Sequence, residues 1–150
     1  MPSSTLITTA LFGCFVSAFF PVVNAEVLLV GIAVASPASA LPAAILGTIG
    51  QVAGKLVLYF VGRGAVRLPQ GRLRSKVDRA SAGLSKHQGG GSAMLFVSAA
   101  SGLPPFFVTS IAAGVARLSV RRFLVAALAG RMLRFGTLVL LPGFAAWLLH

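Results

Sequence analysis

The sequence predicts an all-α integral membrane protein with two inverted repeats, each a re-entrant helical hairpin plus a transmembrane helix. Three observations lead to this fold class: apolar residues dominate, several apolar stretches have membrane-spanning length, and prolines interrupt two of them. Of the 150 residues, 57% are apolar and 10% are charged, whereas soluble domains average about 25% charged residues. So few polar residues cannot cover a water-exposed surface, which argues against a soluble enzyme or a disordered chain.

Four stretches reach the length of about 20 apolar residues that a spanning helix needs: residues 5–35, 41–61, 92–116 and 123–149. The second and fourth predict transmembrane helices. The first contains Pro21 and the third contains Pro104 and Pro105. Proline lacks an N–H group and clashes with the preceding turn, so these prolines are expected at the tips of hairpins.

The second stretch also has a face of small residues. Gly47, Gly50 and Gly54 recur along it. Glycines in such a row allow another helix to approach closely in a membrane. We therefore expect a second helix to pack against this face.

Two basic clusters predict the topology. Residues 62–90 contain seven Lys or Arg residues and one Asp, and Arg117, Arg121 and Arg122 form a second cluster. The positive-inside rule places both on the cytoplasmic side, so the stretch between them leaves and returns on one side. Non-helical backbone at membrane depth must be covered by protein or line a watery cavity, which implies a cavity here.

Within the first basic cluster, four apolar residues recur on one helical face: Leu73, Val77, Ala80 and Leu84. This pattern predicts a short amphipathic helix lying in the membrane interface. The alternative is a solvated basic loop.

The two halves of the chain match each other at intervals. A shift of 83 residues places Pro21 on Pro104 and Gly31 on Gly114. One hairpin entering from each membrane face is the inverted-repeat plan of secondary transporters. We therefore expect a single membrane domain over residues 1–150, with repeat one at about 5–61, a basic cytoplasmic amphipathic linker at 62–91 and repeat two at about 92–149.

Glu26 is the most informative single residue. It is one of two acidic residues in the chain and lies among apolar neighbours. A carboxylate in that setting is costly unless it is protonated, paired or hydrated. Because burial favours the neutral form, Glu26 is predicted to bind a proton, with Asn24 donating to it or lining a polar cavity. The alternative is a static ion pair with a membrane arginine.

Several cations could balance Glu26 or bind an anionic headgroup. Arg131 and Arg134 lie three residues apart within the last apolar stretch, on one helix face. Arg63 ends the second stretch and Lys55 precedes it by about two turns. A planar guanidinium can bind two phosphate oxygens. For Arg63 and Lys55, the alternative is that they extend to the membrane interface.

Chemistry beyond these charges is not expected. The sequence has no evident acid pair or nucleophile–base set, and its two histidines lie far apart, at positions 87 and 150. The single cysteine excludes an intramolecular disulfide. We therefore expect no enzyme activity, no metal and no other cofactor.

The order of the short motifs resembles that of one known family. Three motifs are similar to those of the DedA superfamily. They are Phe20–Glu26, the Gly50–Gly54 spacing before Tyr59 and Gly62-Arg63, and Pro104-Pro105 before Ala113-Gly114. This superfamily is that of the SNARE-associated Golgi protein or VTT domain, and the small YqaA-like members are most similar. The resemblance covers about residues 10–140.

The resemblance implies two opposed re-entrant hairpins and a role in moving lipid, in bacteria including polyprenyl-phosphate carriers, with proton coupling. The membrane-embedded Glu of the family matches Glu26. The acid expected about twelve positions later would fall near Ala38, and Ser101 and Phe107 replace an arginine pair around the second proline. Either Arg131 and Arg134 take over the phosphate contacts, or this branch moves something else.

These observations predict a flippase- or scramblase-type transporter in the bacterial inner (plasma) membrane. Its cargo is a lipid, such as polyprenyl-phosphate or phospholipid, or a small solute. Membrane lipids are the expected partners, and proton or sodium coupling and a homo-oligomer are left open. Nucleic acid is not expected despite the net charge of +11, because this charge suits the anionic cytoplasmic leaflet. The alternative is a non-transporting membrane assembly or interaction factor.

Overall fold

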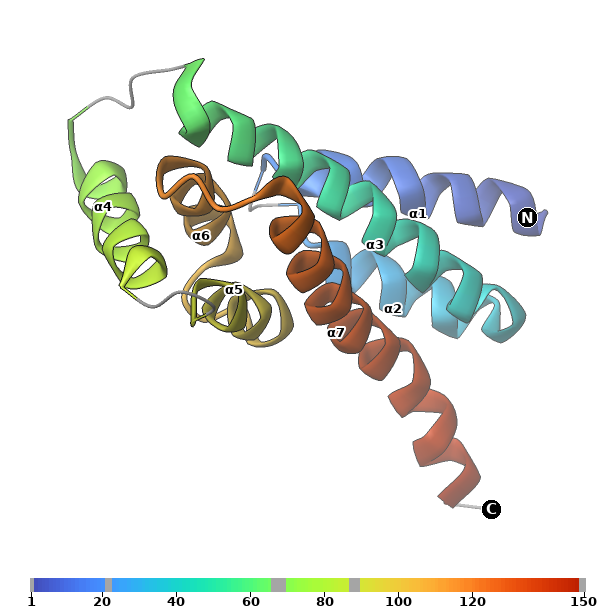
Figure 1. Ribbon diagram of the computed structural model, residues 1–150. Helices are drawn as coiled ribbons and strands as arrows, with labels where there is room; N and C mark the ends of the chain where they lie inside the picture. The colour runs from blue at the N-terminus through green and yellow to red at the C-terminus, as the bar shows by residue number, and fades with distance from the viewer. Residues whose placement is uncertain (1, 21–22, 66–69, 87–89, 149–150) are drawn as a thin grey trace. The chain divides into compact units, whose positions relative to one another are not determined.

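The computed structural model describes residues 2–20, 23–65, 70–86 and 90–148. Every regular element in these residues is a helix (Figure 1): α1 (Ser3–Ser17), α2 (Ala25–Ala35), α3 (Pro37–Phe60), the short turn η1 (Val61–Ala65), α4 (Arg72–Ser85), α5 (Gly90–Ser101), α6 (Phe106–Val115) and α7 (Val120–Leu148). The all-α fold class is confirmed. Two short helices followed by a long one occur twice along the chain, with α4 between the two sets.

The chain forms two compact units, and α3 and α7 contribute to both. The first unit comprises Met1–Gly54 and Arg131–His150, and the second comprises Lys55–Gly130. The inverted relation of the two repeats stays a prediction. The predicted hairpin tip at Pro21 lies outside the described residues.

The small-residue face of α3 packs against α1 in the first unit. A Cβ atom added at Gly50 would collide with the backbone of Leu11, and one added at Gly54 would meet Ala18 and the Phe15 carbonyl oxygen. Backbones can approach this closely only where glycine removes the side chain. The expected close packing on this face is confirmed: α1 is the partner at Gly50 and Gly54, and Gly47 meets Cys14 of α1 and Leu29 of α2.

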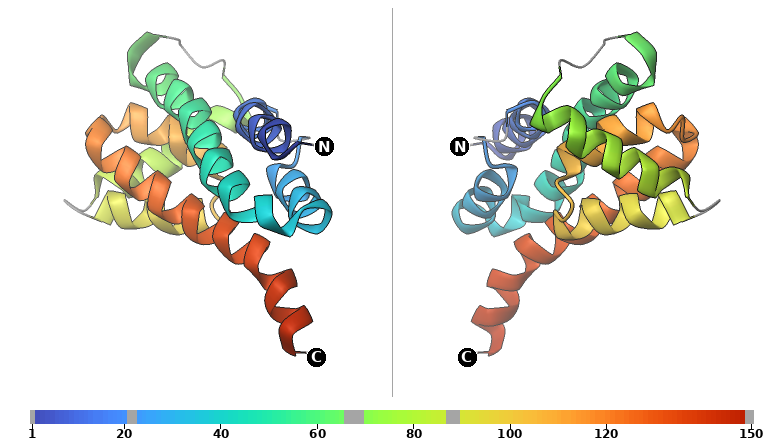
Figure 2. Two further views of the ribbon diagram at one scale, coloured as in Figure 1. Left: turned by 90° about the vertical axis from the view of Figure 1, so that its right-hand side faces the viewer. Right: turned by 90° about the vertical axis from the view of Figure 1, so that its left-hand side faces the viewer.

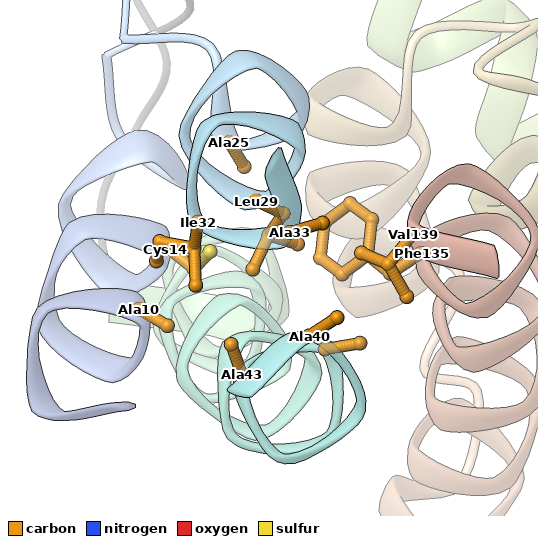
Figure 3. Close-up of a cluster of buried hydrophobic side chains, with 11 residues drawn as sticks. Ala10, Cys14, Ala25, Leu29, Ile32, Ala33, Ala40, Ala43, Phe135 and Val139 are labelled. Atoms are coloured by element: carbon orange, nitrogen blue, oxygen red, sulfur yellow. The ribbon is translucent and has the colours of Figure 1, made fainter. Parts of the chain in front are cut away.

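The core of the first unit joins four helices (Figure 3). Its buried apolar side chains come from α1, α2, α3 and α7, and include Cys14, Leu29, Ile32, Ala43 and Phe135. Lipid tails are as apolar as these side chains, so close packing, more than the hydrophobic effect, holds such a cluster together in a bilayer. This packing brings the α7 segment that contains Arg134 next to α2.

In the second unit, α5 and α6 lie side by side and are joined by a non-helical connection at residues 102–105 (Figure 2). Gly102 has φ +82°, a left-handed conformation that glycine adopts readily. Ser98 donates to the Pro104 carbonyl oxygen at 2.6 Å, and Ser101 accepts from the Leu103 N–H at 3.1 Å. The helix break expected at the proline pair is present, and side chains satisfy part of its exposed backbone.

The helix expected in the basic segment is present as α4, so the solvated-loop alternative is wrong. Val77, Ala80 and Leu84 are buried, whereas Leu73 is 37% exposed. α4 contacts α5 and α6 within the second unit. Its apolar face is therefore covered by the protein itself and is not left for lipid, while most of its Arg and Lys side chains are exposed.

Candidate functional site

Glu26 and Arg134 form an ion pair in the first unit. Glu26 lies in the first turn of α2, and its Oε1 atom is 2.5 Å from Nε of Arg134 on α7. The two side chains are 30% and 25% exposed, respectively. The structure therefore contains the ion pair that the sequence left as the alternative to a protonated Glu26.

Asn24 positions this carboxylate through the backbone. It caps α2, and its Oδ1 atom accepts from the Glu26 N–H at 2.9 Å. Such a cap stabilises the first helical turn, and the positive end of the helix dipole there favours a carboxylate. In the described residues, the hydrogen bond of Asn24 is to the Glu26 main chain. Of the two roles predicted for Asn24, donation to the Glu26 side chain is not formed, and lining of a polar cavity stays a prediction.

Arg131 lies one turn before Arg134 and is buried, with 8% of its surface exposed. Its guanidinium carbon is 5.6 Å from the centre of the Phe135 ring, within the range of cation–π attraction. Its charge interacts with those of Arg134 and Glu26. Two guanidinium groups beside one carboxylate leave the site with an excess positive charge, which suits an anionic ligand.

Arg63 and Lys55 belong to the second unit and have aromatic neighbours there. Arg63 Nη1 donates to the Tyr59 hydroxyl at 2.5 Å, and this hydroxyl donates to the Leu118 carbonyl oxygen. Lys55 is 5% exposed, and its Nζ atom is 5.2 Å from the centre of the Phe107 ring. The interfacial alternative is wrong for Lys55, because its head is buried in the protein.

Sequence reasoning overlooked Gln51. This side chain is buried on α3 in the first unit, and its Nε2 atom donates to the Ser17 hydroxyl at 3.3 Å. Its Oε1 atom has no hydrogen-bond partner in the part of the chain that the structure describes. A buried amide is costly when part of it is unsatisfied, and polar residues within spanning helices often mark a functional path. That rule could have drawn attention to Gln51 from the sequence.

Over the described ranges, no three His, Cys, Asp or Glu side chains gather as a metal site requires. The guanidinium groups of the site suit oxyanions. The two histidines lie outside the described residues.

Two helical segments in the described residues, Pro37–Gly64 and Val120–Leu141, are long and apolar enough to cross a membrane. Large apolar side chains are also exposed on α2, with Val27 at 68% and Val34 at 70%, as expected for lipid contact. With a charged site built around Glu26, these features indicate a small helical membrane protein.

The chain matches the family model of the VTT domain over residues 2–142. It therefore belongs to the VTT-domain family, which is the DedA or SNARE-associated Golgi protein family, and the resemblance seen in the sequence is confirmed. No curated protein and no solved structure matches the chain.

Proposed function

We propose that this protein is a transporter of the flippase or scramblase type that moves a lipid with a phosphate headgroup across the bacterial inner membrane. The observation behind the proposal is the ion pair of Glu26 and Arg134 beside the buried Arg131. Charged side chains within a membrane protein are expensive and usually functional. The VTT family supports the proposal, because its members are generally membrane-associated and are proposed transporters.

The charges at the site suggest how cargo and proton are linked. An ionised Glu26 engages Arg134, whereas a protonated Glu26 releases it and leaves two cations to bind a phosphate group. Phosphate binding and protonation then favour each other, as thermodynamic linkage requires. The cargo in this mechanism is a polyprenyl-phosphate or a phospholipid. A small anionic solute would bind through the same arginines, and a sodium ion could replace the proton at the carboxylate.

The helix order supports a repeat with two opposed re-entrant hairpins. Each set of two short helices and one long helix would supply one hairpin and one spanning helix. Positions related by the 83-residue shift are also similarly buried: Ala43 and Ala44 are buried, as are Ala126 and Ala127. The hydrogen bonds of Ser98 and Ser101 with the backbone between α5 and α6 suit a turn at membrane depth.

The alternative function is a non-transporting assembly factor that binds partners through glycine-rich helix faces. In the structure, the closely packed glycines contact other parts of the same unit: Gly50 meets Leu11, and Gly62 meets Ile111. These faces are therefore occupied within the chain, which favours transport. We also propose that the protein acts without catalysis or a cofactor, with membrane lipids as its partners.

Reconstitution into proteoliposomes tests the proposal. Translocation of a fluorescent phospholipid and of a short polyprenyl-phosphate would be followed by quenching from one side, with and without a pH gradient. The wild-type protein should exceed protein-free vesicles, and Glu26→Gln and Arg134→Gln should lose most of this activity. Asp78→Asn is the matched control, because Asp78 is the other acid and lies exposed on α4. Wild-type protein that moves neither lipid above the protein-free rate would contradict transport.

A further inference from the structure

A groove of about 540 Å³ lies in the second unit between α5 and the first turns of α7. Its apolar walls include Ala93 and Phe96 from α5 and Val125 and Ala129 from α7. Arg121 and Arg122 line the same groove. The groove therefore combines apolar walls with two cations. None of the residues of the Glu26 site line it.

The two arginines occupy an unfavourable place in their helix. They lie in the first turn of α7, which contains no acidic residue, and both are exposed. The positive end of the helix dipole disfavours cations in a first turn. Ser119 begins the helix by accepting from the Arg122 N–H at 3.4 Å. A bound anion would neutralise this concentration of positive charge, so the charge indicates the sign of the occupant.

The apolar lining of the groove indicates that the anion has an apolar tail. Arg121 and Arg122 lie at the start of the segment Val120–Leu141, which is long and apolar enough to cross a membrane. If this segment spans a bilayer, its first residues lie near the headgroups. Ala129 comes two turns later, about 10 Å further along the helix axis. The groove thus has two cations at the start of this segment and an apolar path that follows the segment toward Ala129.

We propose that this groove binds an anionic phospholipid, with its phosphate on Arg121 and Arg122 and one acyl chain along Val125 and Ala129. The planar guanidinium suits a phosphate, since it binds two oxygens at once. This lipid is a resident ligand that stabilises the start of α7, and it is distinct from the cargo proposed to bind at the Glu26 site. The proposed lipid site in this groove is therefore independent of the proposed transport function.

Native mass spectrometry of the full chain in a neutral detergent tests this site. Phosphatidylglycerol should bind in preference to phosphatidylcholine, and inorganic phosphate should not displace it. The double variant Arg121→Gln/Arg122→Gln should weaken phosphatidylglycerol binding about thirty-fold. The matched control, Arg72→Gln/Arg74→Gln on α4, removes the same charge outside the groove and should bind as the wild type does.

Two further variants keep the test decisive if the double variant unfolds. Arg121→Lys/Arg122→Lys preserves the charge and should retain most of the binding, whereas Ala129→Trp fills the exposed apolar end and should weaken binding about ten-fold. Circular dichroism verifies that each variant is folded. Equal binding of the two lipids, displacement by free phosphate, or equal losses in the groove and α4 variants would each overturn the proposal.

Discussion

A double-mutant cycle on Glu26 and Arg134 measures how strongly the candidate site depends on its ion pair. The two atoms Oε1 and Nε are 2.5 Å apart, and the side chains are 30% and 25% exposed. Fully buried pairs cost about 3–5 kcal/mol when one partner is removed, and exposed pairs contribute about 0.2–1 kcal/mol. A partly buried pair should lie between these limits, so we expect a coupling free energy of about 1–2 kcal/mol.

The single variants should differ from each other. Glu26→Gln leaves Arg131 and Arg134 without the carboxylate, and these two like charges interact. Arg134→Gln leaves the carboxylate near Arg131, whose charge also interacts with that of Glu26. We therefore expect Glu26→Gln to lower the free energy of unfolding by about 2–3 kcal/mol, and Arg134→Gln by about 1–2 kcal/mol.

Unfolding by sodium dodecyl sulfate in mixed micelles measures these free energies. The control cycle uses Arg74 and Asp78 on α4, whose Nε and Oδ2 atoms are 3.8 Å apart and whose side chains are 47% and 62% exposed. Its coupling should not exceed about 0.5 kcal/mol. A Glu26–Arg134 coupling no larger than that of the control would refute the inferred ion pair.

Transport measured on the same variants distinguishes a Glu26 that binds and releases a proton from a Glu26 that only forms a static ion pair with Arg134. If Glu26 binds the coupled proton, Glu26→Gln should lose the pH dependence of lipid translocation, because the titrating group is gone. This loss should be seen under conditions where the Glu26→Gln variant is folded, so that unfolding does not cause it. A folded Gln variant with unchanged pH-dependent transport would assign Glu26 to structure alone.

Three further predictions concern packing and topology. Gly114→Ala should destabilise the protein by about 1–3 kcal/mol, because the added Cβ atom would collide with the Tyr59 backbone. A Cβ atom added at Gly31 meets no other atom within 4 Å, so Gly31→Ala should stabilise the protein by up to about 1 kcal/mol. Ser98→Ala should lower the free energy of unfolding by about 1–3 kcal/mol, because the buried Ser98 hydroxyl donates to the Pro104 carbonyl oxygen between α5 and α6. Thermal melts measure the stability of all three variants. Single cysteines at Ser75 and Ser119, in a background without the native cysteine, should react identically with an impermeant reagent, because both lie in basic clusters expected in the cytoplasm.

Each of these predictions has a clear contrary result. Equal effects of the two glycine changes would show that the close approach at Gly114 is not formed. A stable Ser98→Ala variant would show that the connection between α5 and α6 does not depend on this hydroxyl. Labelling of the two cysteines from opposite sides would make residues 92–116 a true membrane span.

Composition and local pattern were enough to predict the two helices of spanning length, the helix α4 and the helix break at the proline pair. Apolar stretches of spanning length, the proline pair at 104–105 and the periodic residues of α4 are properties of consecutive residues. Each depends on the local backbone and on helical periodicity, which act within a few turns. The same holds for the unusual position of Glu26, because an acid among apolar residues is unusual wherever the chain folds.

Only the tertiary structure decided which cation pairs with Glu26. Arg131 and Arg134 are about 60° apart around α7 by helical geometry, so a small rotation of that helix relative to α2 exchanges their roles. The buried contacts of Phe135 with the first unit determine this rotation. The burial of Lys55 and the covering of α4 by α5 and α6 were decided in the same way, because both depend on contacts between residues far apart in the sequence.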